Sequence, residues 1–370
     1  MPRRIALLIG LAFALACSPA PAPALELVGV RELGPTAEAP NIRGRDGGYG
    51  GLAFGRSVWL FGDTTLLEPD TRGSGWRNGT WSWTGDLDAS DGLAPFMAPL
   101  DAWQGPAELF PYTAEEQAYN ELHATWNPDC AAPCGARVML WPAALVDDPE
   151  RARTLVFYGK WSGEPGEWNF WALGSSVAIW TDFDSPPERL VVDASAAEPT
   201  LLWQSDEPLF GAAALLDGGW LYAFACEGGF DKPCLLARVE PERVLERSAW
   251  RYYDGHGYAS ELADAEPVFE GHTILSVHHN AHLDRFLAVY SEPLGTGVML
   301  RTAESLEGPW SRATKAFDAE PSHDDAAPYS ALAHPELARE GGRFEYVTYF
   351  RSPGAWDGEI RLVELELARP

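Results

Sequence analysis

The 370-residue sequence predicts an all-β fold, a five-bladed β-propeller preceded by a signal peptide and a short tether. Three observations support this prediction. Short apolar runs are separated by 36 Gly and 30 Pro, which is typical of many strands joined by tight turns. A pair of apolar strands around a polar or glycine turn recurs five times. Hydrophobic residues make up 46% of the chain, which is enough to fill a core between blades.

Each repeat is expected to supply the two inner strands of a four-stranded blade. The second strands are rich in β-branched and aromatic residues, so both of their faces should be buried. Strands from the two chain ends, 25–30 and 360–367, are expected to close the ring, and a pair of β-sandwiches is the alternative fold. The predicted first strands are 49–54, 140–146, 210–216, 274–280 and 329–337, and the second strands are 58–61, 155–158, 220–225, 286–290 and 344–350.

The charge of the chain excludes one class of partner. Asp and Glu total 54 against 27 Lys and Arg, a net charge of −27. Such a surface repels phosphate backbones and anionic lipid headgroups, so no nucleic-acid partner is expected. We expect a monomer that meets a membrane only through a lipid at its N-terminus.

The N-terminus has the pattern of an export signal. Arg3 and Arg4 precede an apolar run over 5–16, which is too short to span a bilayer, and Cys17 follows. We therefore expect a signal peptide at 1–16, a lipid on Cys17 and a Pro/Ala-rich tether over 17–24. This predicts an exported lipoprotein of the bacterial outer membrane, on its periplasmic side or at the cell surface. Ordinary cleavage after Ala16, with Cys17 unmodified, is the alternative.

The other four cysteines form two local pairs. In an exported and oxidising setting, Cys130–Cys134 and Cys226–Cys234 are expected to be disulfides. Zinc is the competing use of these thiols, but neither pair has the tight spacing of a zinc ribbon.

Asp46 and Asp63 are the candidate catalytic residues. The midpoint between them falls between Phe54 and Gly55, inside the first predicted turn, so a hairpin places them opposite each other. Opposed carboxylates destabilise a sheet unless something offsets their repulsion. Arg43 and Arg45 lie just upstream and are expected to do so, with a bound cation as the alternative. A shared proton would leave one acid and one base, the pair that glycoside hydrolysis uses. Ordinary turn-capping roles are the non-functional interpretation.

Polar residues on the first strands of the fourth and fifth repeats are candidate substrate-binding groups, because these strands line the channel of a propeller. They are His278, His279, Asn280, His334 and Glu336. For each histidine, a structural hydrogen bond is the alternative role. No HExxH-type spacing is present, so no catalytic metal is expected and no cofactor is required. A structural cation in the channel is the remaining option.

A long insertion at about 64–137 interrupts the repeats and is rich in aromatic rings. Rings in polar, glycine-rich loops are where sugar faces would stack, although most of them are expected to cover blade edges. The rings are Trp76, Trp81, Trp83, Trp103, Tyr112, Tyr119 and Trp126, and Trp161, Trp168 and Trp171 follow the second repeat. No phosphate-binding loop, dinucleotide fingerprint or Gly-x-Ser-x-Gly motif occurs, which disfavours acyl and phosphoryl transfer.

Three motifs carry a family resemblance. They are Asp46-Gly-Gly-Tyr49 ending in Trp59-Leu-Phe-Gly-Asp63-Thr64, the Gly308-Pro309-Trp310 stretch, and Tyr329-Ser-Ala-x-Ala-His334-Pro335-Glu336. The first and third resemble a bacterial family catalogued as a domain of unknown function, over most of the chain from about residue 27. The second is shared with arabinanase and invertase propellers and is less specific.

The resemblance implies a five-bladed propeller, since members of the family have this fold. Some members are endo-acting D-arabinanases that cut furanoside polymers, and two aspartates at the first hairpin are thought to be catalytic in them. Asp46 and Asp63 match these aspartates, and Tyr49 is expected to contact substrate. The resulting hypothesis is a glycoside hydrolase acting on a furanoside polysaccharide such as D-arabinan. The alternative is a non-catalytic glycan-binding or envelope scaffold propeller.

Overall fold

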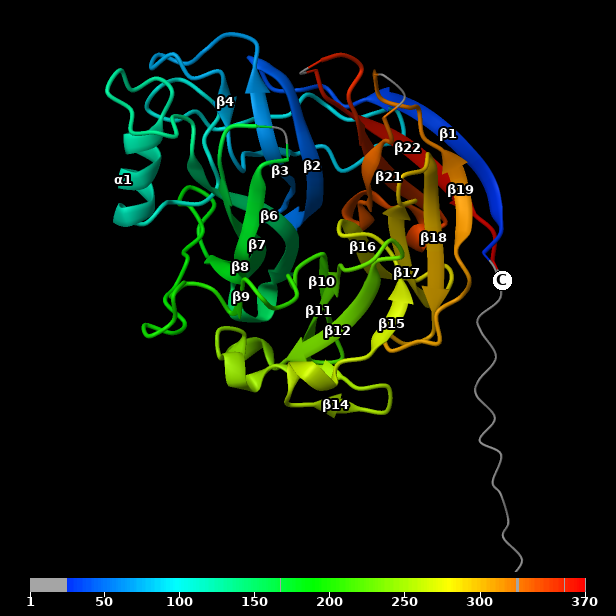
Figure 1. Cartoon of the computed structure of the whole chain (residues 1–370). Helices are drawn as coiled ribbons and strands as arrows, with labels where there is room; N and C mark the ends of the chain where they lie inside the picture. Colours follow the sequence, from blue (N-terminus) through cyan, green and yellow to red (C-terminus); the bar gives the residue numbers. More distant parts are fainter. Residues whose placement is uncertain (1–24, 167, 324–325, 356, 370) are drawn as a thin grey trace, which may run out of the picture.

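A computed structural model describes residues 25–166, 168–323, 326–355 and 357–369. Five antiparallel sheets stand side by side around a central axis, as Figure 1 shows. The predicted five-bladed propeller is confirmed, and the pair of β-sandwiches is ruled out. The predicted signal peptide, the lipid site Cys17 and the tether lie outside the described residues.

The innermost strand of each blade lines the axis. These strands contact one another in chain order, and the first contacts the last, so the ring is closed. Together they surround a cavity of about 270 Å³ in the central channel. The innermost strands are β2 (Ile42–Ala53), β6 (Arg137–Asp148), β10 (Ala213–Asp217), β16 (Leu275–Asn280) and β20 (Tyr329–Ala333).

The second strands are the most deeply buried, as their composition predicts. β20 is shorter than expected, because Pro335 has no N–H to donate and begins a 3-10 turn at Pro335–Leu337. The second strands are β3 (Arg56–Leu66), β7 (Arg153–Gly163), β11 (Trp220–Cys226), β17 (Arg285–Ser291) and β21 (Phe344–Arg351). The outer strands of blades one to four are β4 (Trp76–Arg77), β5 (Trp81–Thr84), β8 (Phe170–Trp180), β9 (Trp203–Gln204), β12 (Pro233–Val239), β13 (Arg251–Tyr253), β14 (Tyr258–Ala259), β15 (Pro267–Glu270), β18 (Gly297–Ala303) and β19 (Thr314–Asp318).

The two chain ends close the ring within blade five. Strand β1 (Leu27–Pro35) pairs antiparallel with β22 (Glu359–Leu367), with Val30 opposite Leu365. Strand β1 therefore forms the outer edge of a sheet whose other strands come from the end of the sequence. The closure predicted from the sequence is confirmed.

Apolar contacts between neighbouring blades form the core. Phe157 of blade two, for example, packs with Trp203 and with Leu221 of blade three, and all three side chains are almost fully buried. Burying one such side chain contributes roughly 1.5–3 kcal/mol. Each blade therefore depends on its neighbours for its stability.

The insertion between β3 and β6 carries a helix that the sequence analysis did not predict, α1 (Ala114–His123). Thr113 caps it, because its side chain accepts the Glu116 N–H while the Glu116 carboxylate accepts the Thr113 N–H. Glu116 also holds the helix against blade two through Lys160 and Arg189. No helix among the described residues is long and apolar enough to cross a membrane.

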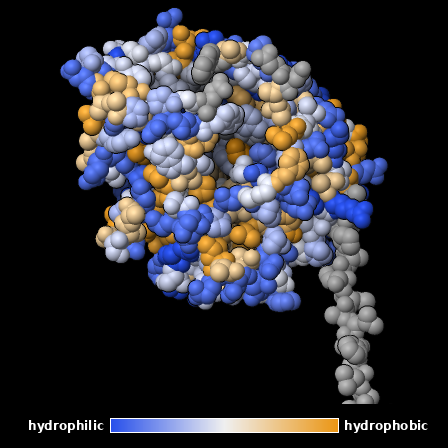
Figure 2. Space-filling view, viewed as in Figure 1, coloured by the Kyte–Doolittle hydropathy of each residue, from blue (hydrophilic) through white to orange (hydrophobic). Residues whose placement is uncertain are grey.

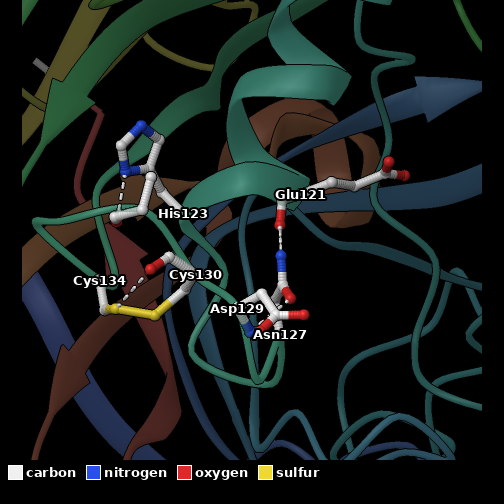
Figure 3. Close-up of a disulfide and its surroundings, with 7 residues drawn as sticks. Glu121, His123, Asn127, Asp129, Cys130 and Cys134 are labelled. Atoms are coloured by element: carbon white, nitrogen blue, oxygen red, sulfur yellow. Dashed lines mark hydrogen bonds between the residues drawn. A yellow bond between two sulfur atoms is a disulfide. The ribbon is translucent and has the colours of Figure 1, made fainter.

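Both predicted disulfides are present. Cys130 and Cys134 close a short loop just after α1, where His123 also bonds to the Ala131 carbonyl oxygen (Figure 3). Cys226 and Cys234 face each other across β11 and β12. Because the sulfur atoms are bonded to each other, the zinc alternative is excluded for these four residues.

Candidate active site

A kink in the first hairpin sets the positions of Asp46 and Asp63. The predicted register holds on both sides of the kink, with Arg45 opposite Thr64 and Tyr49 opposite Leu60. Between these pairs β2 is bulged, because Gly47 and Gly48 have φ values of 90° and 89°, a region that favours glycine. The two aspartates are therefore not the simple cross-strand pair that the sequence predicted.

The bulge moves the carboxylate of Asp46 over the backbone of β3. A Cβ atom added to Gly62 would lie 2.5 Å from Oδ1 of Asp46, so only glycine leaves room there. Gly62 directly precedes Asp63, and the charge of Asp46 acts on the pKa of Asp63. The hairpin thus brings the two carboxyl groups together as one electrostatic unit.

Asp46 has donors that stabilise its charged form. The hydroxyl of Tyr329, the first residue of β20, donates to Oδ2 of Asp46 at 2.8 Å. Burial raises the pKa of Asp46, while this hydroxyl and the backbone N–H groups of Asp63 and Asp46 lower it. Burial and the charge of Asp46 raise the pKa of Tyr329 well above its usual value, so this hydroxyl keeps its proton.

Asp63 receives fewer hydrogen bonds than Asp46, and the negative charge of Asp46 opposes its ionisation. Burial, and then the charge of Asp46, raise its pKa to about 7. The positive charge of Arg137 and a hydrogen bond from Nε1 of Trp141, at 3.0 Å, act in the opposite direction. Because the anion of Asp46 raises the pKa of Asp63, Asp46 ionises first and Asp63 loses its proton last.

The pair lies where several innermost strands begin. Asp46 is near the start of β2, Tyr329 begins β20, and Arg137 begins β6. Innermost strands of a propeller run in the same direction, so these starts share one face of the ring. Both carboxylates are half-buried, and thus keep some contact with solvent. The space-filling view in Figure 2 shows a hollow near the middle of the ring.

Neither predicted arginine neighbour acts on the pair, which corrects the expectation that they would offset its repulsion. Arg43 is exposed and bonds to Asp357 at 2.7 Å. Arg45 is fully buried, pairs with Glu38 at 2.6 Å and stacks on Phe61. The charge of Arg45 is therefore compensated by Glu38 and not by the aspartates.

His334 and Glu336 are also placed away from the carboxylate pair. His334 is completely buried, stacks on Trp59 and bonds to Thr348 at 2.7 Å. Glu336 accepts a hydrogen bond from Ser57. Both side chains lie against β2 at Gly50, four residues or roughly 13 Å along the strand from Asp46. They join blade five to blade one, and the expectation that they line the same pocket is corrected.

The remaining predicted binding residues either line the central channel or make hydrogen bonds within the protein, and some do both. Tyr49 and His278 line the channel cavity, but each is bonded to protein, Tyr49 to the Ala212 carbonyl oxygen and His278 to Glu345. Asn280 is buried and donates to the same Glu345. His279 is exposed and lies within 3.7 Å of Asp284. These contacts fit the structural alternative, and none of them reaches the aspartate pair.

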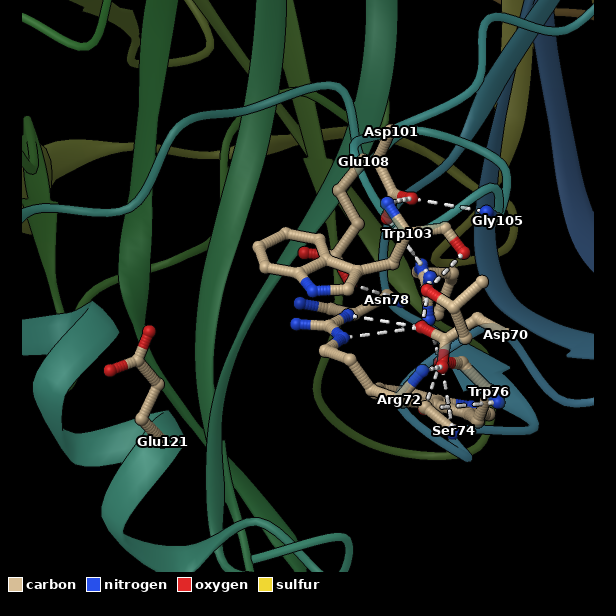
Figure 4. Close-up of polar contacts among 12 residues, drawn as sticks. Asp70, Arg72, Ser74, Trp76, Asn78, Asp101, Trp103, Gly105, Glu108 and Glu121 are labelled. Atoms are coloured by element: carbon tan, nitrogen blue, oxygen red, sulfur yellow. Dashed lines mark hydrogen bonds and ion pairs between the residues drawn. The ribbon is translucent and has the colours of Figure 1, made fainter.

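The insertion forms a separate pocket of about 410 Å³, and two of its lining residues link it to Asp63. Arg137 and Glu108 line the pocket, and the charges of both act on the pKa of Asp63. In Figure 4, Arg72 stacks on Trp103 while Glu121 of α1 stands on the other side of the view. The insertion rings Trp76, Trp103, Tyr112 and Trp126 line this pocket, whereas Trp81 packs in the core.

The sequence analysis did not single out three residues that contact or tune the pair, namely Tyr329, Trp141 and Arg137. Tyr329 stands in the third family motif, which was the only available signal. Trp141 and Arg137 belong to the next blade, and nothing in their local sequence points to Asp63. Within the described ranges, no group of three or more His, Cys, Asp or Glu side chains is placed to hold a metal ion.

Comparisons with known proteins place this geometry in context. A candidate hydrolase from Bacteroides ovatus is similar in structure, with a TM-score of 0.60, 14% identity, and coverage of 88% of this chain and 86% of its own. Zg3597, a family 117 glycoside hydrolase from Zobellia galactanivorans, has a TM-score of 0.51 and 10% identity, covering 91% of this chain and 90% of its own. Identities this low show a shared fold only.

At the level of sequence, no curated protein matches the chain. One family does, described as a domain of unknown function (DUF4185), and its pattern matches residues 35–350. These residues include the hairpin of Asp46 and Asp63, all five innermost strands and the insertion. The chain belongs to the DUF4185 family.

Proposed function

We propose that this propeller is a glycoside hydrolase that acts on a furanoside polysaccharide such as D-arabinan, with Asp46 and Asp63 as its catalytic pair. One observation carries the proposal: two adjacent, half-buried carboxyl groups, of which Asp46 accepts the Tyr329 hydroxyl while the charge of Asp46 raises the pKa of Asp63. Such an arrangement provides an acid and a base at the same pH. The furanoside substrate is supported by the resemblance of the first and third motifs to D-arabinanases.

The surroundings of the two groups suggest their roles. Asp63, with its pKa raised to about 7, is the acid that protonates the leaving oxygen of the glycosidic bond. Asp46 ionises first and accepts a hydrogen bond from the Tyr329 hydroxyl, so it is the base or nucleophile. Tyr329 and Trp141 act as positioning residues, because each holds one carboxylate oxygen. Hydrolysis by such a pair adds water across the glycosidic bond and needs no cofactor.

Export and a lipid on Cys17 belong to the same proposal, because a polysaccharide substrate lies outside the cytoplasm. They rest on the N-terminal sequence alone. The non-catalytic alternative, a glycan-binding propeller, is tested by the same experiment as the catalytic function.

The experiment measures release of reducing ends from D-arabinan and from a panel of other furanoside polymers. Asp46→Asn and Asp63→Asn should each lower kcat by about 10²–10³-fold, and the double variant should lose little more, because the two groups act as a unit. Asp284→Asn, at an almost fully exposed position in blade four, is the control and should match wild type. Unchanged turnover in either single variant contradicts the proposal, and binding without any turnover favours the glycan-binding alternative.

A further inference from the structure

A connected group of aromatic rings leads from Asp63 to the surface of blade two. We propose that these rings, Trp141, Trp161, Phe170 and Trp168, bind consecutive sugar rings of an uncharged polysaccharide; we call them the ring platform. This inference rests on the proposed function and extends it to the way in which a polymer is held.

The platform begins at the catalytic pair. Trp141 donates to Oδ1 of Asp63, and its ring centroid lies 5.0 Å from that of Trp161 and 5.3 Å from that of Phe170. The ring of Trp168 lies 6.2 Å from that of Phe170. No break separates the carboxylate from the outermost ring, so a chain held on the platform reaches the reacting groups.

Glycines in β7 make room for the rings. Gly159 is paired with Trp141, and Gly163 is paired with Phe170. A Cβ atom on Gly159 would lie 2.6 Å from Nε1 of Trp161, and one on Gly163 would lie 2.9 Å from a side-chain atom of Met139. Gly159 therefore leaves room for the ring of Trp161, whereas the close neighbour of Gly163 is Met139.

The two outermost rings of the platform, Trp168 and Phe170, do not contribute to the stability of the fold. Trp168 is 85% exposed and has a φ of 58°, although bulky residues rarely adopt positive φ. Phe170 is 37% exposed. Exposed rings and a strained backbone do not stabilise this hairpin, and such features are typical of binding sites.

The aromatic surface and the negative charge around it determine which kind of polysaccharide the platform binds. A sugar ring has an apolar C–H face and a rim of hydroxyl groups, so a flat aromatic surface removes the C–H face from water and leaves the hydroxyl groups solvated. Residues 161–171 include two Glu and no Lys or Arg, and the whole chain carries −27. An acidic polysaccharide would be repelled, so the occupant is uncharged.

The test measures binding separately from turnover. Affinity gel electrophoresis in the Asp46→Asn background compares uncharged polymers (linear arabinan, galactan and xylan) with acidic polygalacturonate. Trp168→Ala and Phe170→Ala should each raise the apparent Kd for the uncharged polymer, measured from the retardation, about fivefold. This is the scale of one aromatic contact. Leu294→Ala is the matched control, because Leu294 is 84% exposed with a φ of 56° but lies in blade four, and it should bind like wild type.

The outcomes separate this inference from the proposed function. Loss of binding in both platform variants supports the platform, even if no polymer is hydrolysed and the proposed function fails. Hydrolysis that depends on Asp46 and Asp63, together with unchanged binding in the platform variants, overturns the platform alone. Retardation by polygalacturonate only, or by none of the polymers, also overturns it.

Discussion

Glu116 of the insertion and the Asp46–Asp63 pair of blade one are carboxylates that lie wholly or partly out of water, and they differ in the charges beside them. Glu116 of α1 meets Arg189 and Lys160, both at 2.7 Å. Burial alone would raise the pKa of Glu116, but these two cations outweigh it and hold the pKa at about 2. Asp63 is also buried, yet its nearest strong influence is another carboxylate, and its pKa rises to about 7.

The difference shows which carboxylates stabilise the protein and which do not. Glu116 has its charge compensated in a fixed arrangement, and the helix it carries is held to blade two. The charge of Asp63 is only partly compensated, by Arg137 and Trp141, so ionising this group destabilises the folded state. Strongly perturbed and uncompensated groups concentrate at functional sites, and this contrast supports a catalytic role for the aspartate pair.

The largest expected effect on stability comes from replacing Glu116, which pairs with Lys160 and Arg189. Glu116→Gln leaves the buried Arg189 without its carboxylate partner, while Lys160 keeps Glu198, and should lower the free energy of unfolding at pH 7 by about 3 kcal/mol. Glu115→Gln, one residue earlier and exposed, is the control and should change it by less than about 0.5 kcal/mol. Denaturant unfolding measures both.

The pH dependence of this effect has a defined sign. The folded pKa of Glu116 is lowered, so its contribution to stability is present above its unfolded pKa of 4.5 and is lost as the pH falls toward about 2. Equal stability of the Glu116 and Glu115 variants at pH 7 would show that the cluster does not hold the helix.

A smaller change in stability, and one of opposite sign, is expected when Asp63 is replaced. The folded pKa of Asp63 is raised, so ionising this group costs stability as the pH rises from 3.8 toward about 7. Asp63→Asn should therefore raise the free energy of unfolding at pH 8 by roughly 1–3 kcal/mol and have little effect at pH 4.

Thermal or denaturant unfolding at the two pH values checks this prediction, with the exposed Asp91→Asn as the control. Destabilisation of the Asp63→Asn protein at pH 8 would assign Asp63 a structural role instead.

The smallest expected effect compares two arginines. Arg137 lowers the pKa of Asp63, so Arg137→Gln should move the alkaline limb of the pH–activity profile upward by roughly half a pH unit. Arg43→Gln removes the same charge from an exposed ion pair with Asp357 and should leave that limb in place. Equal displacement by both variants would mean that only the overall charge matters, and that Arg137 has no specific role.

Much of the fold was predictable because it depends on local patterns. Repeated pairs of β-prone strands indicated five blades, and the apolar segments at both chain ends indicated the closing sheet. The helix at Ala114–His123 was missed within a segment treated only as a ring-rich insertion, although Thr113 and Glu116 form a recognisable capping box. The pairing of the cysteines followed from their short spacing.

The candidate site was predictable only in part. Hairpin symmetry and a family motif identified Asp46 and Asp63, both of which belong to one local element. The supporting residues come from blades two and five, namely Trp141, Arg137 and Tyr329. No local pattern relates them to the pair, because their distance to it is fixed by the closure of the whole ring.

The sequence by itself determined the five repeats, the net charge of −27, the cysteine pairs and the two candidate aspartates. Only the tertiary structure decided which side chains serve those aspartates. Arg45 directly precedes Asp46 in the sequence, yet the fold buries it against Glu38 and Phe61. Tyr329 is far from Asp46 in sequence, but ring closure brings its hydroxyl within 2.8 Å, because β20 and β2 are neighbours in the closed ring.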